Sequence, residues 1–225
     1  MTNSSVKFIT IEGMEGAGKS TNLDYVINFF QQRDIEFTAT REPGGTEISE
    51  KIRHLLLDHH RESLAPLAEL MLIFAARAQH IDKVIRPALE AGQWVICDRF
   101  TDATYAYQGE GRELGGKKVE TLERFVQQDL QPDLTIILDV PVTLSAARVE
   151  QRGGELDRFE VEGSDFFQRV RDAYHQRVSV APERYALIDA SQIGSVVGAD
   201  GMFSHSRLRC ECVEYESDVL RDSRR

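Results

Sequence analysis

The stretch Gly13-Met14-Glu15-Gly16-Ala17-Gly18-Lys19-Ser20 fills every fixed position of the pattern G-x-x-x-x-G-K-[ST]. It follows an apolar run at residues 6–11 and leads into a helical pattern that begins near Thr21. The glycines let backbone N–H groups turn toward a phosphate chain at the positive N-terminus of a helix. Lys19 reaches the outer phosphates, and the Ser20 hydroxyl can bind Mg²⁺. The stretch therefore predicts a triphosphate-binding loop.

Short apolar runs recur along the chain, at residues 8–11, 37–40, 94–97, 134–138 and 185–188. Helical periods lie between them, which is typical of a parallel sheet covered by helices on both faces. Residues 66–90 predict a long helix, Pro141 opens another, and Ser164 or Asp165 is the expected N-cap of a third. The predicted fold is α/β with a five-stranded parallel sheet.

The length and charge of the chain limit its partners. With 225 residues it suits one α/β domain, or one domain with a small lid. A formal charge of -10 argues against a nucleic-acid backbone as the main partner, while a mononucleotide in a local Arg and Lys pocket stays compatible. No apolar stretch approaches the length of a membrane span, and no signal-peptide h-region is seen at the N-terminus.

The cysteines are Cys97, Cys210 and Cys212, which make no disulfide framework. Cys97 lies in an apolar run, so we expect a buried, reduced thiol and a cytoplasmic protein. Cys210 and Cys212 lack a second pair that would complete a metal site.

Two further polar segments follow predicted strands. Asp98-Arg99 comes directly after residues 94–97, and Arg41-Glu42-Pro43-Gly44-Gly45-Thr46 follows residues 37–40. The carboxyl ends of parallel strands line the ligand crevice of an open sheet, which places both segments beside the phosphate loop. An arginine on a stiff turn suits a second phosphorylated molecule. Either segment could instead be an ordinary charged surface loop.

A charged, Gly-containing stretch from Arg152 to Glu160 interrupts two predicted helices. It has little to bury, so we expect a mobile lid over about residues 151–163. Two arginines there, Arg152 and Arg158, would suit phosphoryl transfer between bound nucleotides, although a solvated salt-bridged loop is the alternative. A GTPase would carry an N-K-x-D motif after a strand, and the sequence has none.

Together, residues 8–21, 41–46, 74–77, 98–100, 107–109 and 152–159 resemble the bacterial thymidylate kinase family over about residues 5–192. The resemblance implies a P-loop nucleoside monophosphate kinase fold, transfer of the ATP γ-phosphoryl group to dTMP with Mg²⁺, and a homodimer. The alternatives are a kinase for another small nucleoside monophosphate, an ATP-binding module without catalysis, and a P-loop ligase.

The resemblance also implies roles on the donor side. Ser20 and Asp98 are implied to bind Mg²⁺. Gly16 stands where some relatives carry a loop arginine, so the lid is expected to supply the positive charge of that arginine. The implied catalytic residues are Lys19, Arg99, Arg152 and, as second choice, Arg158. The implied ATP contacts are Gly13, Met14, Glu15, Gly16, Ala17, Gly18, Lys19, Ser20, Thr21 and Asp189.

On the acceptor side, the resemblance places Glu15 near the dTMP 3′-hydroxyl and Tyr107 against a ribose 2′-hydroxyl. Phe74 is expected to stack on thymine and Arg77 to bind its carbonyl oxygen. The full set implied for dTMP is Glu15, Arg41, Pro43, Arg53, Phe74, Arg77, Arg99, Thr104, Tyr107 and Gln108.

The resemblance ends near residue 192, and residues 193–225 read as an irregular, weakly ordered tail. We hypothesise a shifted reading frame near residue 198, because the pattern changes abruptly there. Resequencing of the coding DNA tests this, and an intact frame would defeat it.

Overall fold

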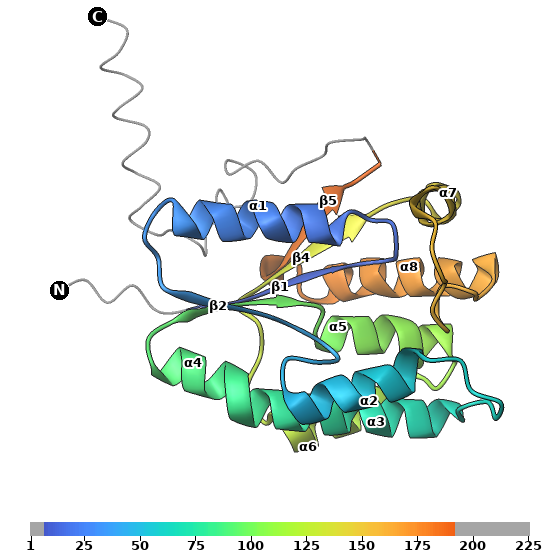
Figure 1. Ribbon diagram of the computed structural model, residues 1–225, viewed down its shortest axis with the longest axis horizontal. Helices are drawn as coiled ribbons and strands as arrows, with labels where there is room; N and C mark the ends of the chain where they lie inside the picture. Colours follow the sequence, from blue (N-terminus) through green and yellow to red (C-terminus); the bar gives the residue numbers. More distant parts are fainter. Residues whose placement is uncertain (1–6, 192–225) are drawn as a thin grey trace, which may run out of the picture.

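The computed structural model describes residues 7–191 of the protein (Figure 1). The predicted tail at residues 193–225, with Cys210 and Cys212, lies outside the described residues.

The predicted sheet is confirmed, because all strands fall on the predicted apolar runs and pair in parallel. They form one five-stranded sheet in the order β2-β3-β1-β4-β5. The central strand β1 is buried along its whole length, as a strand with neighbours on both sides and helices on both faces must be. The bounds are β1 Phe8–Gly13, β2 Phe37–Arg41, β3 Trp94–Asp98, β4 Leu134–Asp139 and β5 Tyr185–Asp189.

Helices cover both faces of the sheet. Figure 1 shows α1 on one side and α3, α4 and α6 on the other. The bounds are α1 Lys19–Gln31, α2 Glu47–Leu57, α3 Pro66–His80, η1 Ile81–Ile85, α4 Arg86–Glu90, α5 Thr101–Thr104, η2 Tyr105–Gly111, α6 Gly116–Gln127, α7 Val142–Arg152, α8 Ser164–Val180 and η3 Pro182–Arg184. None of the helices within residues 7–191 is long and apolar enough to cross a membrane.

The long helix predicted over residues 66–90 is present, but it contains a π-helical turn, η1, between α3 and α4. Pro87 lies just beyond that turn, and a proline inside a helix lacks an N–H and crowds the carbonyl group four residues earlier. A wider π turn relieves such crowding without ending the helix.

Two expected helix starts can be compared with the structure. α7 begins at Val142 with Pro141 as its N-cap, one residue later than predicted. α8 begins at Ser164 itself, and Gly163 takes the N-cap position in place of Ser164 or Asp165. Asp165 instead lies in the first turn, where its negative charge favours the helix dipole.

The main core lies between the sheet and the helices around it. Val26 and Phe30 of α1 are buried there, beside Ile9 and Ile136 of the sheet. Cys97 is a buried free thiol in a second cluster on β3, as predicted.

Candidate active site

A cavity of about 480 Å³ lies at the carboxyl ends of the parallel strands, beside the phosphate loop. It brings together most of the predicted site residues, which come from the phosphate loop, the ends of β2 and β3, and helices α2, α3, α5, η2 and α7. The predicted residues that line it are Glu15, Gly16, Gly18, Lys19, Ser20, Thr21, Pro43, Arg53, Arg77, Asp98, Arg99, Thr104, Tyr107, Gln108 and Arg152. The structure therefore joins the loop and the later segments in one site.

Some predicted residues lie away from the cavity wall. Gly13, Met14 and Ala17 form the base of the loop, with the Met14 and Ala17 side chains buried in the core. Asp189 lies at the exposed end of β5, where its carboxylate accepts a hydrogen bond from the Ser191 N–H at 2.9 Å. Its ATP contact stays a prediction.

Lys19 is held inside the phosphate loop. Its ammonium group donates to the carbonyl oxygens of Gly13 at 3.0 Å and Met14 at 2.8 Å. Gly18, the N-cap of α1, has a φ of 87°, which a glycine adopts without strain. Burial, together with the nearby positive charge of Arg99, lowers the pKa of Lys19 to about 8. The loop thus presents a positive charge that a phosphate chain can neutralise.

At pH 8, binding of ATP is expected to draw protons onto the protein. The free enzyme then carries a neutral Lys19 in about half of the molecules, because its pKa is about 8, and the phosphate charge raises that pKa. The uptake should vanish below pH 7, where Lys19 is already charged. Calorimetric titration in buffers of different ionisation enthalpy measures it. Lys19→Met should abolish the proton uptake that comes from Lys19. An unchanged proton uptake in that variant would show that Lys19 is not the group that takes up the proton.

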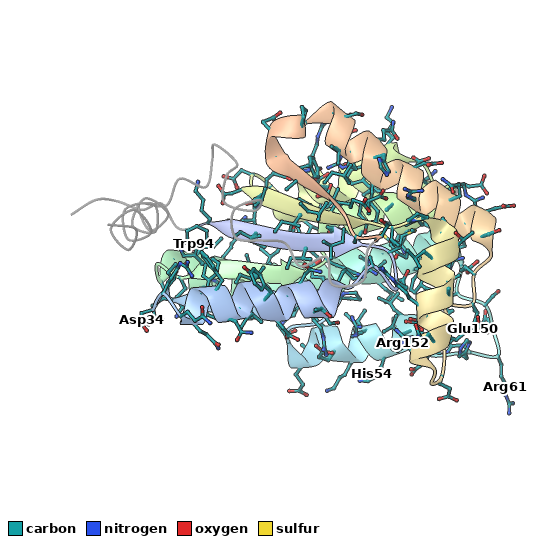
Figure 2. The ribbon with its side chains drawn as sticks, turned by 90° about the horizontal axis from the view of Figure 1, so that it is seen from above. Asp34, His54, Arg61, Trp94, Glu150 and Arg152 are labelled. Atoms are coloured by element: carbon teal, nitrogen blue, oxygen red, sulfur yellow. The ribbon has the colours of Figure 1, made fainter. Side chains whose placement is uncertain are left out.

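Helix α7 lies against the phosphate loop, which sequence motifs did not reveal. The Ser145 hydroxyl donates to the Glu15 carbonyl oxygen at 2.6 Å, and Arg148 donates to the Gly16 carbonyl oxygen at 3.2 Å. A Cβ atom on Gly16 would lie 2.7 Å from the Ser145 carbonyl oxygen, at a φ of +69°. The loop therefore has no room for a side chain at Gly16. Of the two predicted lid arginines, Arg152 at the end of α7 lines the cavity and Arg158 does not (Figure 2).

Asp98 offers an oxygen ligand beside the loop. Its Oδ1 atom is buried and has no hydrogen-bond partner within residues 7–191. Asp98 and Ser20 line the same cavity, and a carboxylate with a hydroxyl suits Mg²⁺, which takes few protein ligands and completes its shell with phosphate and water. These residues therefore fit the magnesium ion that the loop pattern implies.

Arg99 lies at the centre of the acceptor side, with a left-handed φ of 66°. Its guanidinium donates to Glu15 at 2.7 Å, to the Tyr107 hydroxyl at 3.2 Å and to the Tyr174 hydroxyl at 3.4 Å. Burial alone would raise the pKa of Glu15, but Arg99 and Lys19 keep it below its usual value. Tyr174, on α8, was not expected at the site.

Arg77 is held in a buried network. It donates through Nε to Glu42 at 2.6 Å and through Nη2 to the Thr104 hydroxyl at 2.9 Å, and His80 contacts the second Glu42 oxygen at 2.9 Å. Among the described residues, no acceptor reaches the buried Nη1 atom of Arg77. That N–H group is available to a carbonyl oxygen of a ligand in the cavity.

The structure does not place Phe74 on the cavity wall, so its contact with the base stays a prediction. Its side chain is only 2% exposed and packs against Leu70 and Val119 behind the cavity wall. Ile73 lines the cavity instead, four residues before Arg77 and so on the same helix face. A residue three before Arg77 and one four before it are both its neighbours, so spacing alone did not separate them.

Replacement of Phe74 by alanine is expected to lower the free energy of unfolding by about 3 kcal/mol or more, because it removes a fully packed aromatic side chain. Urea unfolding measures this. Ile73→Ala should instead raise the KM for the acceptor with a smaller loss of stability. If Phe74→Ala instead keeps normal stability and weakens the affinity for the acceptor, Phe74 contacts the acceptor.

Two predicted arginines point elsewhere. Arg41 pairs with Glu50 at 2.9 Å on the surface and does not line the cavity. Arg158 pairs with buried Glu69 at 2.6 Å and donates to the Leu56 carbonyl oxygen, so it anchors the lid segment and does not face the phosphate loop. Arg152 lines the cavity and pairs with Glu160 at 2.8 Å.

The sheet order, the phosphate loop after the central strand, and a cavity that extends well beyond the loop define a P-loop NTPase fold with room for a second ligand. The family model described as Thymidylate kinase matches residues 11–198. The chain belongs to the thymidylate kinase family.

Its relatives agree. A Pseudomonas putida thymidylate kinase is 55% identical over 193 residues, covering 86% of this chain and 91% of the relative. A Chromohalobacter salexigens thymidylate kinase is 57% identical over 187 residues, covering 83% and 88%. The crystal structure of thymidylate kinase from Ehrlichia chaffeensis aligns with a TM-score of 0.64 at 33% identity, covering 82% of this chain and 93% of that one.

Proposed function

We infer that the protein is an ATP-dependent thymidylate kinase, which transfers the γ-phosphoryl group of ATP to dTMP and yields dTDP and ADP for dTTP synthesis. The observation that carries this inference is that one cavity holds the phosphate loop together with Arg99 and Arg77. The loop suits the donor, Arg99 suits the acceptor phosphate, and the free Nη1 atom of Arg77 suits a base carbonyl group.

On the donor side, the backbone of residues 13–18 and the Lys19 ammonium group bind the ATP phosphates. Ser20 and Asp98 would hold Mg²⁺, which when bound neutralises phosphate charge and orients the γ-phosphoryl group. Arg152 stabilises the negative charge that spreads over the transferring group.

On the acceptor side, the Arg99 guanidinium binds the dTMP phosphate, with Arg53 beside it on the cavity wall. Glu15 and Tyr107, which are hydrogen-bonded at 2.6 Å, form the wall next to the sugar. The attacking atom is an ionised phosphate oxygen, so catalysis needs positioning and charge stabilisation and no general base.

We also propose that the protein forms a homodimer. Large apolar side chains are exposed on α2, α3 and α6, helices that pack on one side of the sheet (Figure 1). Leu67 and Met71 of α3 are each 53% exposed. The others are Ile48, Leu55 and Phe125. Light scattering should give twice the 25.5 kDa mass of the chain, and a monomer at working concentration would exclude the dimer.

The buried reduced thiol of Cys97 supports a cytoplasmic location. We also propose a single kinase domain at residues 1–192 with a lid at about residues 151–163, which includes the irregular segment between α7 and α8.

Turnover of dTMP, dUMP, dCMP and UMP with ATP and Mg²⁺, followed by coupled ADP release, tests the function. We expect dTMP to give the highest kcat/KM. A better acceptor among the other three would assign the protein to a different monophosphate. ADP release that does not depend on any acceptor, or ATP binding without turnover, would overturn the kinase assignment.

A further inference from the structure

A buried carboxylate stands behind the acceptor wall and does not touch the cavity. Glu69 of α3 is 0% exposed and is absent from the cavity lining, whereas Gln108 of η2 lines it. One Glu69 oxygen accepts from the Gln108 amide nitrogen at 2.7 Å and from Arg112 Nε at 3.4 Å. The other oxygen contacts Arg158 Nη2 at 2.6 Å.

These partners fix which way the Gln108 amide faces. A carboxylate between two guanidinium groups has only acceptor oxygens, so it can bind the NH₂ end of an amide and not the carbonyl end. The two ends of a glutamine amide are told apart by such a neighbour. Gln108 must therefore turn its NH₂ group to Glu69, and its Oε1 atom is the polar end left for the cavity. Within residues 7–191, no donor is bound to that oxygen.

The same wall carries a free donor. Arg77 presents its unpartnered Nη1 atom, and its Nη2 atom donates to Thr104. Thr104 and Gln108 are four residues apart along the continuous helix of α5 and η2, and both line the cavity. A donor from Arg77 and an acceptor from Gln108 therefore line the same cavity as Thr104.

This polarity matches one type of pyrimidine edge. A thymine edge has an acceptor, the 4-carbonyl oxygen, next to a donor, the N3–H group. A cytosine edge reverses both, with a 4-amino donor next to an N3 acceptor. A site built to hydrogen-bond one pattern leaves buried groups unpaired when it receives the other.

We propose that Glu69 is a positioning residue for base selectivity, which holds the Gln108 amide so that Oε1 accepts from N3–H of the acceptor base. The proposal rests on dTMP being the acceptor. Glu69 acts through Gln108 and does not touch the nucleotide. If residue 69 were a neutral amide, the Gln108 amide could turn over and offer its NH₂ group to a cytosine N3 atom.

The test uses dTMP and 5-methyl-dCMP, which share the methyl group and the sugar phosphate and differ only at this edge. Displacement titration calorimetry on the full chain gives both Kd values. We expect Glu69→Gln to lower the preference for dTMP about tenfold, the effect of one hydrogen bond. Gln108→Met should lower it similarly, and Glu69→Gln added to Gln108→Met should change the preference no further.

Glu123→Gln is the matched control, because Glu123 is a buried carboxylate of α6 that binds Tyr105 and Gln131 and neither lines the cavity nor contacts Gln108, and its preference should equal that of the unmodified protein. A purely structural role of Glu69 would weaken both ligands alike. An unchanged preference in Glu69→Gln or in Gln108→Met overturns the proposal, as does a further change in the double variant. If Glu69→Gln does not fold, Gln108→Met decides. A failure of the unmodified protein to phosphorylate dTMP would instead defeat the proposed function.

Discussion

Replacement of Arg152 by alanine is expected to lower kcat about 10³-fold, while the KM for dTMP changes less than about threefold. Arg152 lines the cavity from the end of α7, and its side chain is 55% exposed, with Glu160 as its partner. The Arg152 end of this ion pair is exposed, so the guanidinium can leave Glu160 for the phosphoryl group as charge develops there, while buried Glu160 keeps its hydrogen bond from the Asp157 N–H at 3.2 Å. Steady-state rates with both substrates varied give the two parameters.

The matched control is Arg158→Ala, a second arginine of the same segment. Arg158 is bound to Glu69 and to the Leu56 carbonyl oxygen, so its loss should act on substrate affinity and lid anchoring more than on the chemical step. If Arg158→Ala costs more in kcat than Arg152→Ala, the catalytic charge belongs to Arg158. If Arg152→Ala raises only the KM, Arg152 is a binding residue.

Replacement of Asp98 by asparagine is expected to lower kcat at millimolar Mg²⁺ about 100-fold and to raise the Mg²⁺ concentration for half-maximal rate at least about tenfold. The change keeps the shape of the side chain and removes its charge. Its Oδ1 atom is buried and has no partner among the described residues, so few protein contacts are lost. Rates measured across a Mg²⁺ titration give both numbers.

Asp139→Asn serves as the comparison, since Asp139 also ends a strand but is paired with Arg171 at 2.8 Å and does not line the cavity. It should leave the Mg²⁺ dependence unchanged. An Asp98→Asn enzyme with the Mg²⁺ dependence of the unmodified protein would remove Asp98 from the metal site.

The sheet and most of the site could be predicted because both follow from local patterns. Apolar runs separated by helical periods indicate parallel strands, and parallel strands bring their carboxyl ends to one edge. Asp98 and the phosphate loop must then meet, although Ser20 and Asp98 are 78 positions apart in the sequence. The register confirms this, because Asp98 pairs with Ile11 just before the loop.

The structure differs from the prediction at side chains whose direction depends on tertiary packing. Ile73 and Phe74 are both apolar neighbours of Arg77, and only the packing of α3 against α6 decides which one enters the core. Arg158 turns away from the phosphates because it forms an ion pair with a buried carboxylate, Glu69 of α3. Local spacing cannot reveal such a partner, and the same is true of Tyr174 and Arg148.

Because α7 contacts the phosphate loop, the length of this helix determines where Arg152 lies relative to the loop. Ser145 and Arg148 of α7 donate hydrogen bonds to the loop backbone. Arg152 lies about one helical turn beyond Arg148. The length of α7 therefore sets the distance between the Arg152 guanidinium and the donor phosphates. One residue inserted between Arg148 and Arg152 would advance the arginine by about 1.5 Å and rotate it about 100° around the axis. Substitutions on the outer face of α7 should be tolerated far better than any change in its length.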